Sequence, residues 1–424
     1  MTGDRKRQLL LNVRLEEKCR AELARELDIL CARADYRPEF GYFLELFRYG
    51  HLPEALRKRV DRPIVNLLCV GAPLELFAAS GLHPYKVFSG SLSAAQVAAV
   101  GLPALMCPML KAALGALELE TAAGSTRPWV LPTTCDWVVK FQALMGLGGL
   151  APPAPLHWLE LPHLKDSPRG RARWQVEIAA LRDFLAGLAG LKPTRRALLD
   201  SLADFRKTRR AFSRLIEARR AGRVPAVWFS LIANSFFLDR LENWTAALEA
   251  GLSALDGGLS AQASSGAGAG QIKTPTGVFL AGSPIFFPNF KLLYLLEEAG
   301  LAVLGDDLCS SERIFPAQVA VDDPSEFGLM RALGESYHQG CLCPTFGDNE
   351  RRLNNILGAA AGAPVKGVVF QVLKGCHPHE LESLSLEEPL KRAGLRFIKL
   401  ETDYTAEDTR NLLTRLEAFA GTLY

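Results

Sequence analysis

The sequence has no long apolar run and little excess charge of either sign. No uninterrupted apolar stretch reaches the roughly 20 residues that a membrane span needs, and Met1–Arg20 is polar and charged, without the apolar core of a secretory signal. The net charge of +3 is too small to indicate nucleic acid or an acidic membrane as a partner. We therefore expect a cytoplasmic protein that binds neither membrane nor nucleic acid.

Several motifs of nucleotide and hydrolase chemistry are also missing. The sequence contains no GxxxxGK followed by Ser or Thr, no glycine fingerprint after a strand, and no GxSxG elbow. It has no CxxC pair, which disfavours structural zinc because such sites commonly use paired ligands. The chain therefore shows no ATP site of its own and no ordinary zinc motif.

The pattern of apolar residues predicts an α/β protein with two parallel sheets. Short β-rich runs alternate with helical runs, which is typical of such sheets. The predicted strands are Pro63–Cys69, Tyr85–Phe88, Ala104–Cys107, Trp129–Leu131, His157–Leu161, Gly277–Ala281, Ala302–Leu304, Gly367–Leu373 and Phe397–Leu400.

These strands define the expected domains. Residues 1–60 form an N-terminal helical segment, and residues 61–169 form a first α/β domain. Residues 170–256 form a helical middle region, residues 257–271 a linker rich in Gly, Ser and Ala, and residues 272–424 a second α/β domain. We therefore expect two parallel-sheet α/β domains of similar architecture.

One helix of the middle region is expected to be strongly basic. Eleven Lys or Arg residues and three acidic residues lie between Lys192 and Arg223. Such a helix could bind the phosphates of a nucleotide or of coenzyme A, but a charge run of this kind is more often a solvated face. We favour the solvated face.

The positions of the nine cysteines are more informative than their number. Five are expected where a strand gives way to a helix: Cys69, Cys107, Cys135, Cys309 and Cys376. Functional groups gather beyond the carboxyl ends of parallel strands, so these five are expected to share one crevice. Cys341 and Cys343 form the pair CLC, whereas Cys19 and Cys31 lie in a helical stretch and are interpreted as packing residues.

This placement favours an iron–sulfur cluster. A helix N-terminus offers free N–H groups and a positive dipole end, which lower the pKa of a thiol and donate hydrogen bonds to cluster sulfur. In the cytoplasm, cysteines are metal-bound or catalytic more often than disulfide-bonded. A single cysteine is usually a small buried hydrophobe, but five at strand ends favour the cluster. His377, His379, Asp306 and Asp307 lie beside these cysteines and are interpreted as surface or capping residues.

The same motifs resemble those of a known family. CVGAPLELFAASG (Cys69–Gly81), CPMLKA (Cys107–Ala112), TTCD (Thr133–Asp136), GDDLC (Gly305–Cys309) and LKGCHPHELES (Leu373–Ser383) resemble the 2-hydroxyacyl-CoA dehydratase D-component family, which also contains subunits of ATP-dependent benzoyl-CoA reductases. GCLCPTFGDNERR (Gly340–Arg352) and LETDYTAEDTRNLLTRLEAF resemble its branch of double-cubane cluster proteins. The resemblance covers about residues 60–424.

The resemblance implies an iron–sulfur cofactor held between two Rossmann-like domains. Cys69, Cys107 and Cys135 would ligate iron from the first domain, and Cys309, Cys376 and one of Cys341 or Cys343 from the second. Six thiolates and a bridging sulfide would hold a double cubane, 8Fe–9S; we favour Cys341 over Cys343 as the sixth. The resemblance also implies a homodimer and a partner, an ATP-hydrolysing iron–sulfur activator that delivers low-potential electrons.

Three hypotheses for function follow. The first, which we favour, is an iron–sulfur oxidoreductase that reduces a small molecule at a double-cubane cluster. The second is a 2-hydroxyacyl-CoA dehydratase or benzoyl-CoA reductase subunit with one 4Fe–4S cluster and an acyl-CoA substrate. The third is a non-catalytic binding or electron-storage protein. No residue in the sequence identifies the substrate or the proton donors.

Overall fold

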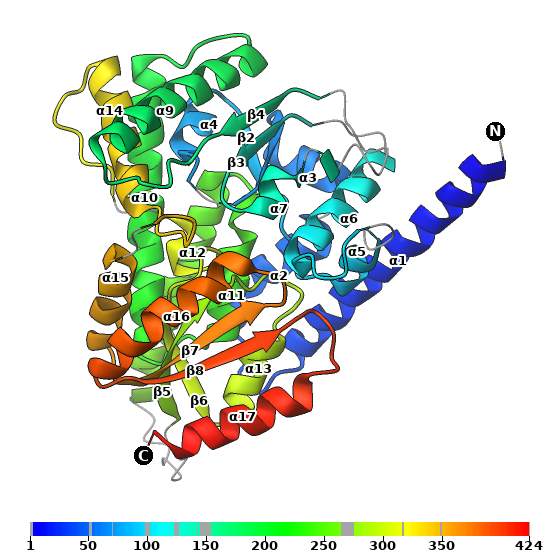
Figure 1. Cartoon of the computed structure of the whole chain (residues 1–424), viewed down its shortest axis with the longest axis vertical. Coiled ribbons are helices and arrows are strands. Elements are labelled where there is room, and N and C mark those ends of the chain that lie inside the picture. The colour runs from blue at the N-terminus through cyan, green and yellow to red at the C-terminus, as the bar shows by residue number, and fades with distance from the viewer. Residues whose placement is uncertain are drawn as a thin grey trace.

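The computed structural model describes residues 3–50, 53–69, 71–97, 102–122, 127–141, 143–144, 154–263, 275–315, 318–347 and 350–423. Within these ranges, eight strands form two separate four-stranded sheets, and every strand pair is parallel. Helices surround both sheets (Figure 1). The predicted α/β class with two Rossmann-like units is confirmed.

The first sheet has the order β2-β1-β3-β4. Its strands are β1 (Ile64–Leu67), β2 (His83–Lys86), β3 (Trp129–Pro132) and β4 (Leu156–Leu159), and its connecting helices are α4 (Leu74–Ala79), α5 (Leu92–Val97), α6 (Pro108–Ala122) and α7 (Asp136–Val139). Every residue of β1 and β3 is buried, as expected of central strands covered by helices on both faces.

The second sheet has the order β6-β5-β7-β8. Its strands are β5 (Thr276–Gly282), β6 (Leu301–Asp306), β7 (Val365–Leu373) and β8 (Arg396–Thr402), and its helices are α13 (Lys291–Glu298), α14 (Glu326–Gly340), α15 (Glu350–Ala361), α16 (His377–Arg392) and α17 (Thr409–Gly421). In each sheet, the first strand in chain order lies between the second strand, at the edge, and the third strand. This order creates a switch point, where loops from neighbouring strands diverge and leave a crevice.

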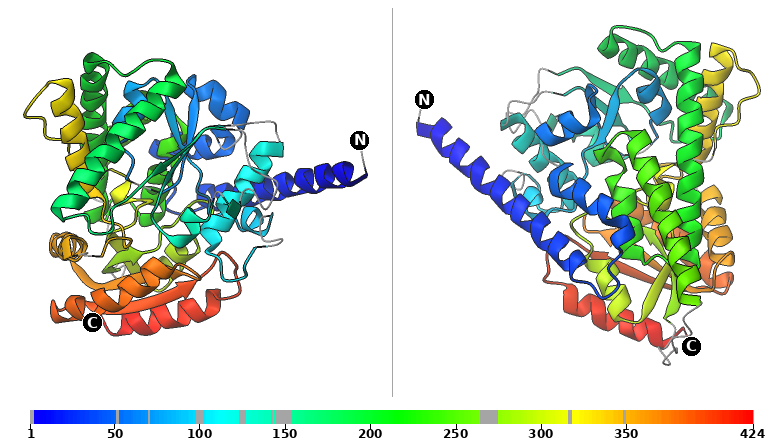
Figure 2. Two further views of the ribbon diagram at one scale, coloured as in Figure 1. Left: turned by 45° about the horizontal axis from the view of Figure 1, so that its top comes forward. Right: turned by 180° about the vertical axis from the view of Figure 1, so that it is seen from behind.

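Helices of the middle region and the N-terminus join the two sheets. They are α1 (Gly3–Cys31), α2 (Gly41–Gly50), α3 (Pro53–Val60), α9 (Pro168–Ala189), α10 (Arg195–Arg220), α11 (Ala226–Asn234) and α12 (Leu241–Ala263). Helix α10 packs against both α4 and β6, and one apolar cluster contains Val65 of β1, Trp228 of α11 and Leu280 of β5. The N-terminal end of α1 projects from the body of the molecule (Figures 1 and 2).

Serine and threonine caps explain where three of these helices begin. The side chains of Ser167, Thr194 and Ser325 accept hydrogen bonds from backbone N–H groups in the first turns of α9, α10 and α14. Such caps satisfy N–H groups that have no partner within the helix. Among the described residues, no helix combines the length and the apolar character that crossing a bilayer requires.

Two sequence predictions about elements are wrong. Ala104–Cys107 forms turns instead of a strand: the Met106 N–H bonds the Pro103 carbonyl across a turn, and Leu105 is 78% exposed. The predicted linker at 257–271 is partly helical, because α12 continues to Ala263, and residues 264–271 lie outside the described residues. Glycine costs a helix about 1 kcal/mol each, a penalty that the packing of α12 against α10 can offset.

Candidate functional site

Four of the five predicted strand-end cysteines follow strands as expected. Cys69 follows β1, Cys135 follows β3, Cys309 follows β6 and Cys376 follows β7. Cys107 is the exception, because it precedes α6 without a preceding strand. Cys341 is the C-cap of α14, with Cys343 two residues beyond it. No cysteine of the described residues is in a disulfide.

One group of thiols consists of Cys107, Cys135 and Cys376, and we call it the first thiol group. Cys107 donates a hydrogen bond to Cys376, which raises the pKa of Cys107. This bond, together with nearby His379, lowers the pKa of Cys376 to about 5. Burial raises the pKa of Cys135 to about 11, and the charge of Cys376 adds to this rise. Two of these thiols come from the first sheet's loops and one from the second's.

Helix N-termini surround the first thiol group. Backbone N–H groups of Met109 and Leu110 in α6 face Cys107, those of Trp137 and Val138 in α7 face Cys135, and that of His379 in α16 faces Cys376. Backbone donors at these helix ends lower the pKa of all three thiols, as predicted, but the net pKa falls only for Cys376, chiefly because of the bond from Cys107. At Cys107 the hydrogen bond to Cys376, together with burial, outweighs the backbone donors, and at Cys135 burial does so.

The second thiol group consists of Cys69, Cys309, Cys341 and Cys343. Burial raises the pKa of Cys69, and the neighbouring Cys135 and Cys309 raise it further. Burial likewise raises the pKa of Cys343, with added repulsion from Cys341 and Cys69. A Cβ atom placed on Gly71, just after Cys69, would lie 3.6 Å from the Cys341 sulfur. Cys69 comes from the first sheet and the other three from the second unit, so this group also spans both.

Three buried cations lie around the second thiol group. Lys86 Nζ donates to the Cys309 carbonyl at 3.1 Å, Lys165 Nζ to the Cys341 carbonyl at 2.8 Å, and Arg313 Nη1 to the Leu342 carbonyl at 2.5 Å. Burial lowers the pKa values of Lys86 and Lys165, whereas the nearby thiols raise them. These cations would offset the negative charge that thiolates bring to a buried site.

A chain of buried ion pairs holds the three loops of the second unit. Asp307 pairs with Arg313 at 3.0 Å and with Arg352 at 2.6 Å, and Arg352 also pairs with Glu382 at 2.8 Å. Glu382 lies 3.5 Å from His379. These residues connect the Cys309 loop, the Cys341–Cys343 loop through Leu342, and the Cys376 loop.

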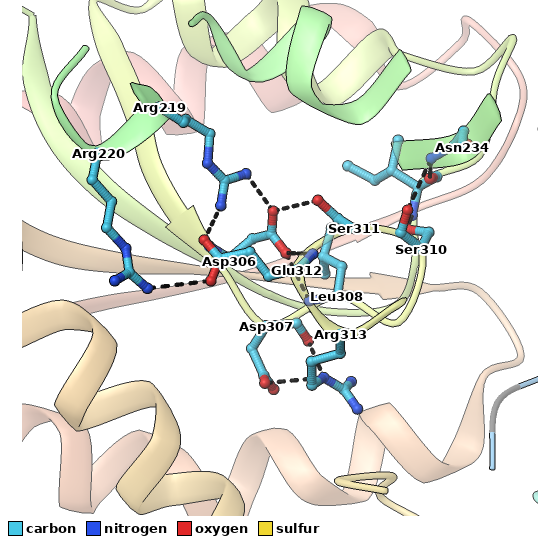
Figure 3. A network of polar contacts seen from close by, with 11 residues as sticks. Arg219, Arg220, Asn234, Asp306, Asp307, Leu308, Ser310, Ser311, Glu312 and Arg313 are labelled. Atoms are coloured by element: carbon cyan, nitrogen blue, oxygen red, sulfur yellow. Dashed lines mark hydrogen bonds and ion pairs between the residues drawn. The ribbon is translucent and has the colours of Figure 1, made fainter. Parts of the chain in front are cut away.

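A neighbouring network fixes the base of the Cys309 loop. Arg219 of α10 bonds Asp306 at 2.5 Å and also Glu312, and Ser311 donates to Asp306 at 2.6 Å (Figure 3). Arg219 is 1% exposed. The surface interpretation of Asp306 and Asp307 is therefore wrong, since both are buried and paired with arginines. Asp306 does have a capping role, because its carboxylate accepts bonds from the Leu308 and Glu312 N–H groups. Arg219 belongs to the basic helix that was predicted to be a solvated face, but its own side chain is buried.

Glu75 forms a third buried network. Its carboxylate accepts bonds from Arg209 Nη2 at 2.5 Å and Tyr337 Oη at 2.7 Å, and Tyr337 Oη accepts a bond from the Leu74 N–H at 3.0 Å. Tyr337 and Cys341 lie one helical turn apart, since the Cys341 N–H bonds the Tyr337 carbonyl. This network links the α4 loop beside Cys69 to the helix that ends at Cys341.

Residues outside the thiol groups have simpler roles. Cys19 is buried 3.8 Å from Ser91 Oγ, as a packing residue should be, whereas Cys31 is exposed and the packing prediction is wrong for it. His379 is buried, in contrast to its predicted loop exposure, but His377 is exposed as predicted. Sequence reasoning missed the buried arginines and lysines because their patterns resemble those of surface charges. Only Arg313 and Arg352 gave a signal, because they lie near cysteine motifs in the sequence.

Comparisons with known proteins agree with this arrangement. The family model for 2-hydroxyglutaryl-CoA dehydratase, D-component, matches residues 69–423. The chain is 26% identical over 390 residues to an Escherichia coli (strain K12) protein that carries the name dehydratase subunit YjiM, covering 90% of this chain and 96% of the relative. It is 21% identical over 379 residues to (R)-2-hydroxyglutaryl-CoA dehydratase, subunit beta, of Acidaminococcus fermentans, covering 86% and 94%.

A third relative matches over a shorter stretch. The (R)-phenyllactyl-CoA dehydratase beta subunit of Clostridium sporogenes is 26% identical over 132 residues, covering 31% of this chain and 34% of the relative. The family match includes all seven cysteines of the two thiol groups, and it begins just after β1. The chain therefore belongs to the 2-hydroxyglutaryl-CoA dehydratase D-component family and is a dehydratase-type enzyme component.

Proposed function

We propose that this chain is the iron–sulfur component of a reductase in which the two thiol groups hold a double-cubane cluster. Cys107, Cys135 and Cys376 would hold one cubane, and Cys69, Cys309 and one of the Cys341–Cys343 pair the other. The observation that carries this proposal is that the seven predicted cysteines gather into two adjacent groups. The groups adjoin where Cys69 and Cys135 face each other.

The donor set fits such a group. All seven donors are thiols, the ligand type that iron–sulfur clusters require. Among the described residues, no three or more His, Cys, Asp or Glu side chains converge on a point suited to a single metal ion. The ligands of a polynuclear cluster bind different irons, so thiols from several loops could hold one together.

The surrounding residues would keep the thiolates in place and compensate their charge. The N-terminal N–H groups of α6, α7 and α16 would donate to sulfur, and Lys86, Lys165 and Arg313 would offset the charge. A cluster of this type supplies electrons at low potential. Since the sequence has no ATP motif, we propose that an ATP-hydrolysing iron–sulfur activator delivers them, that the chain works as a homodimer, and that it reduces a small molecule in the cytoplasm.

A second candidate function rests on the comparisons. The relatives carry the names of dehydratase subunits, two of them specific for acyl-CoA thioesters. On this alternative, the chain would hold one 4Fe–4S cluster and act with an unlike subunit on a 2-hydroxyacyl-CoA. Binding of an acyl-CoA by the purified chain would favour it.

Iron and sulfide content after anaerobic purification distinguishes these functions. We expect about eight irons per chain for a double cubane; about four would contradict it and favour the second candidate, and a colourless, iron-free protein would contradict both. Cys376→Ser should lower the iron content, because Cys376 lies at the centre of the first thiol group. Cys31→Ser is the matched control, since Cys31 is exposed at the end of α1. Electron paramagnetic resonance of the reduced protein provides a second measurement.

A further inference from the structure

A cavity of about 90 Å³ lies beside the Cys309 loop. Its walls are mostly apolar, with Phe47, Phe88, Phe237, Phe286 and Phe287 among the lining residues. Lys86 is the only charged side chain among the described residues that line it. We call it the Lys86 cavity.

Lys86 is buried and has hydrogen-bonding capacity left. Its side chain carries three N–H groups, and the Cys309 carbonyl at 3.1 Å takes one of them. The ammonium nitrogen also lies 5.4–5.9 Å from the ring centroids of Phe88, Phe237 and Phe286, which are weak acceptors. The charged or ionisable groups that face it are the thiols of Cys309 and Cys69 and the guanidinium of Arg313. No carboxylate of the described residues pairs with it.

Asn234 and Ser310, two other polar residues of the cavity, already have protein partners. The Asn234 amide bonds the Ser310 carbonyl at 3.0 Å and accepts from the Phe287 N–H at 2.9 Å. Ser310 Oγ accepts from the Ile285 N–H at 3.0 Å. A ligand with one strong acceptor group would therefore bind at Lys86, with its remaining atoms against the phenylalanine rings.

The size of the cavity limits what it can hold. A cavity of about 150 Å³ accommodates benzene, so about 90 Å³ is suited to roughly three to five non-hydrogen atoms. We propose that the Lys86 cavity binds a small monocarboxylate of this size, with its carboxylate on Lys86 and its alkyl part among the rings. The binding itself does not depend on the proposed function, but the role of the ligand does. If Cys309 holds a cluster, a molecule bound beside Cys309 would lie where a substrate of that cluster is expected.

Titration calorimetry of the anaerobically purified protein tests the binding, with iron measured on the same sample. Acetate should bind with one site per chain, whereas pivalate, which is too large, and acetamide, which is neutral, should bind at least tenfold more weakly, all at ionic strength matched with sodium chloride. Equal affinity for acetate and pivalate, or no acetate binding, would overturn the proposal. Because this comparison uses the unaltered chain, it does not depend on any variant folding.

Variants test the role of Lys86. Lys86→Met should weaken acetate binding at least tenfold, and Lys86→Arg should restore most of it. Lys207→Met is the matched control, because it removes the same charge from a side chain that is 61% exposed. Unchanged binding by Lys86→Met overturns the proposal. Full iron content without acetate binding contradicts the cavity alone, whereas acetate binding by an iron-free protein contradicts the proposed function alone.

Discussion

Replacing Arg352 by leucine should destabilise the protein strongly, because Arg352 connects two of the cysteine loops. Its side chain is fully buried between Asp307, at 2.6 Å, and Glu382, at 2.8 Å, and both carboxylates are themselves almost inaccessible to solvent. Leucine would fill part of the volume but leave two buried carboxylates without their shared cation. Loss of one partner from a buried ion pair typically costs about 3–5 kcal/mol.

The partners that remain place the expected cost at the lower end of that range. Arg313 still pairs with Asp307 at 3.0 Å, and His379 still lies 3.5 Å from Glu382. We therefore expect the free energy of unfolding to fall by about 3 kcal/mol. At an m-value of about 3 kcal/mol/M, this lowers the urea midpoint by about 1 M.

The adjacent residue provides the control. Arg351 is 46% exposed and pairs with Asp166 at 3.3 Å, so Arg351→Leu should cost less than about 1 kcal/mol. Urea unfolding followed by circular dichroism measures both variants. If the two unfold within about 0.5 kcal/mol of each other, Arg352 does not anchor these loops and the reasoning is refuted.

Two further predictions concern a glycine and a histidine. Gly375→Ala should cost about 1–3 kcal/mol more than Gly394→Ala: both glycines have positive φ, but a Cβ at Gly375 would lie 1.9 Å from the Leu105 carbonyl oxygen, whereas Gly394 has open space; equal urea midpoints would contradict this. Burial lowers the pKa of His83 to about 4, so its contribution to stability is complete above pH 6.5 and is lost as the pH falls towards 4. Between pH 7 and pH 5, the titration of His83 should lower the free energy of unfolding by about 2 kcal/mol. Over the same pH range, the free energy of unfolding of His83→Gln should fall by about 2 kcal/mol less than that of the unaltered protein.

The alternation of strands and helices was predictable because it depends on local patterns. Eight of the nine predicted strands overlap observed strands, since each combines β-branched or aromatic residues with flanking turn signals. Ala104–Cys107 was misassigned because a short apolar run between prolines does not show whether a neighbouring strand exists to pair with it. The cysteines at strand ends were also predictable from local patterns, because each lies between a strand-like run and the start of a helix.

The charged interior could not be predicted in this way. Arg219 and Arg352 lie in sequences rich in arginine, where most neighbours are surface residues. What distinguishes them is the partner, and Asp306 and Asp307 lie 87 and 45 residues away in sequence. Long-range pairs of this kind depend on how two units pack, which single-sequence patterns do not contain. The sequence predicted that thiols of both units would share one crevice, but which thiols lie together was missed for the same reason.

That grouping has a consequence for assembly. The first thiol group takes Cys107 and Cys135 from one unit and Cys376 from the other, and the second takes Cys69 from one and its remaining thiols from the other. Neither sheet alone can complete either group. A cofactor that needs all these thiols would therefore bind the chain only after both units have folded and docked, and its binding free energy would stabilise the docked state. Several of these buried thiols have raised pKa values, so binding of such a cofactor would release protons from the interface between the units.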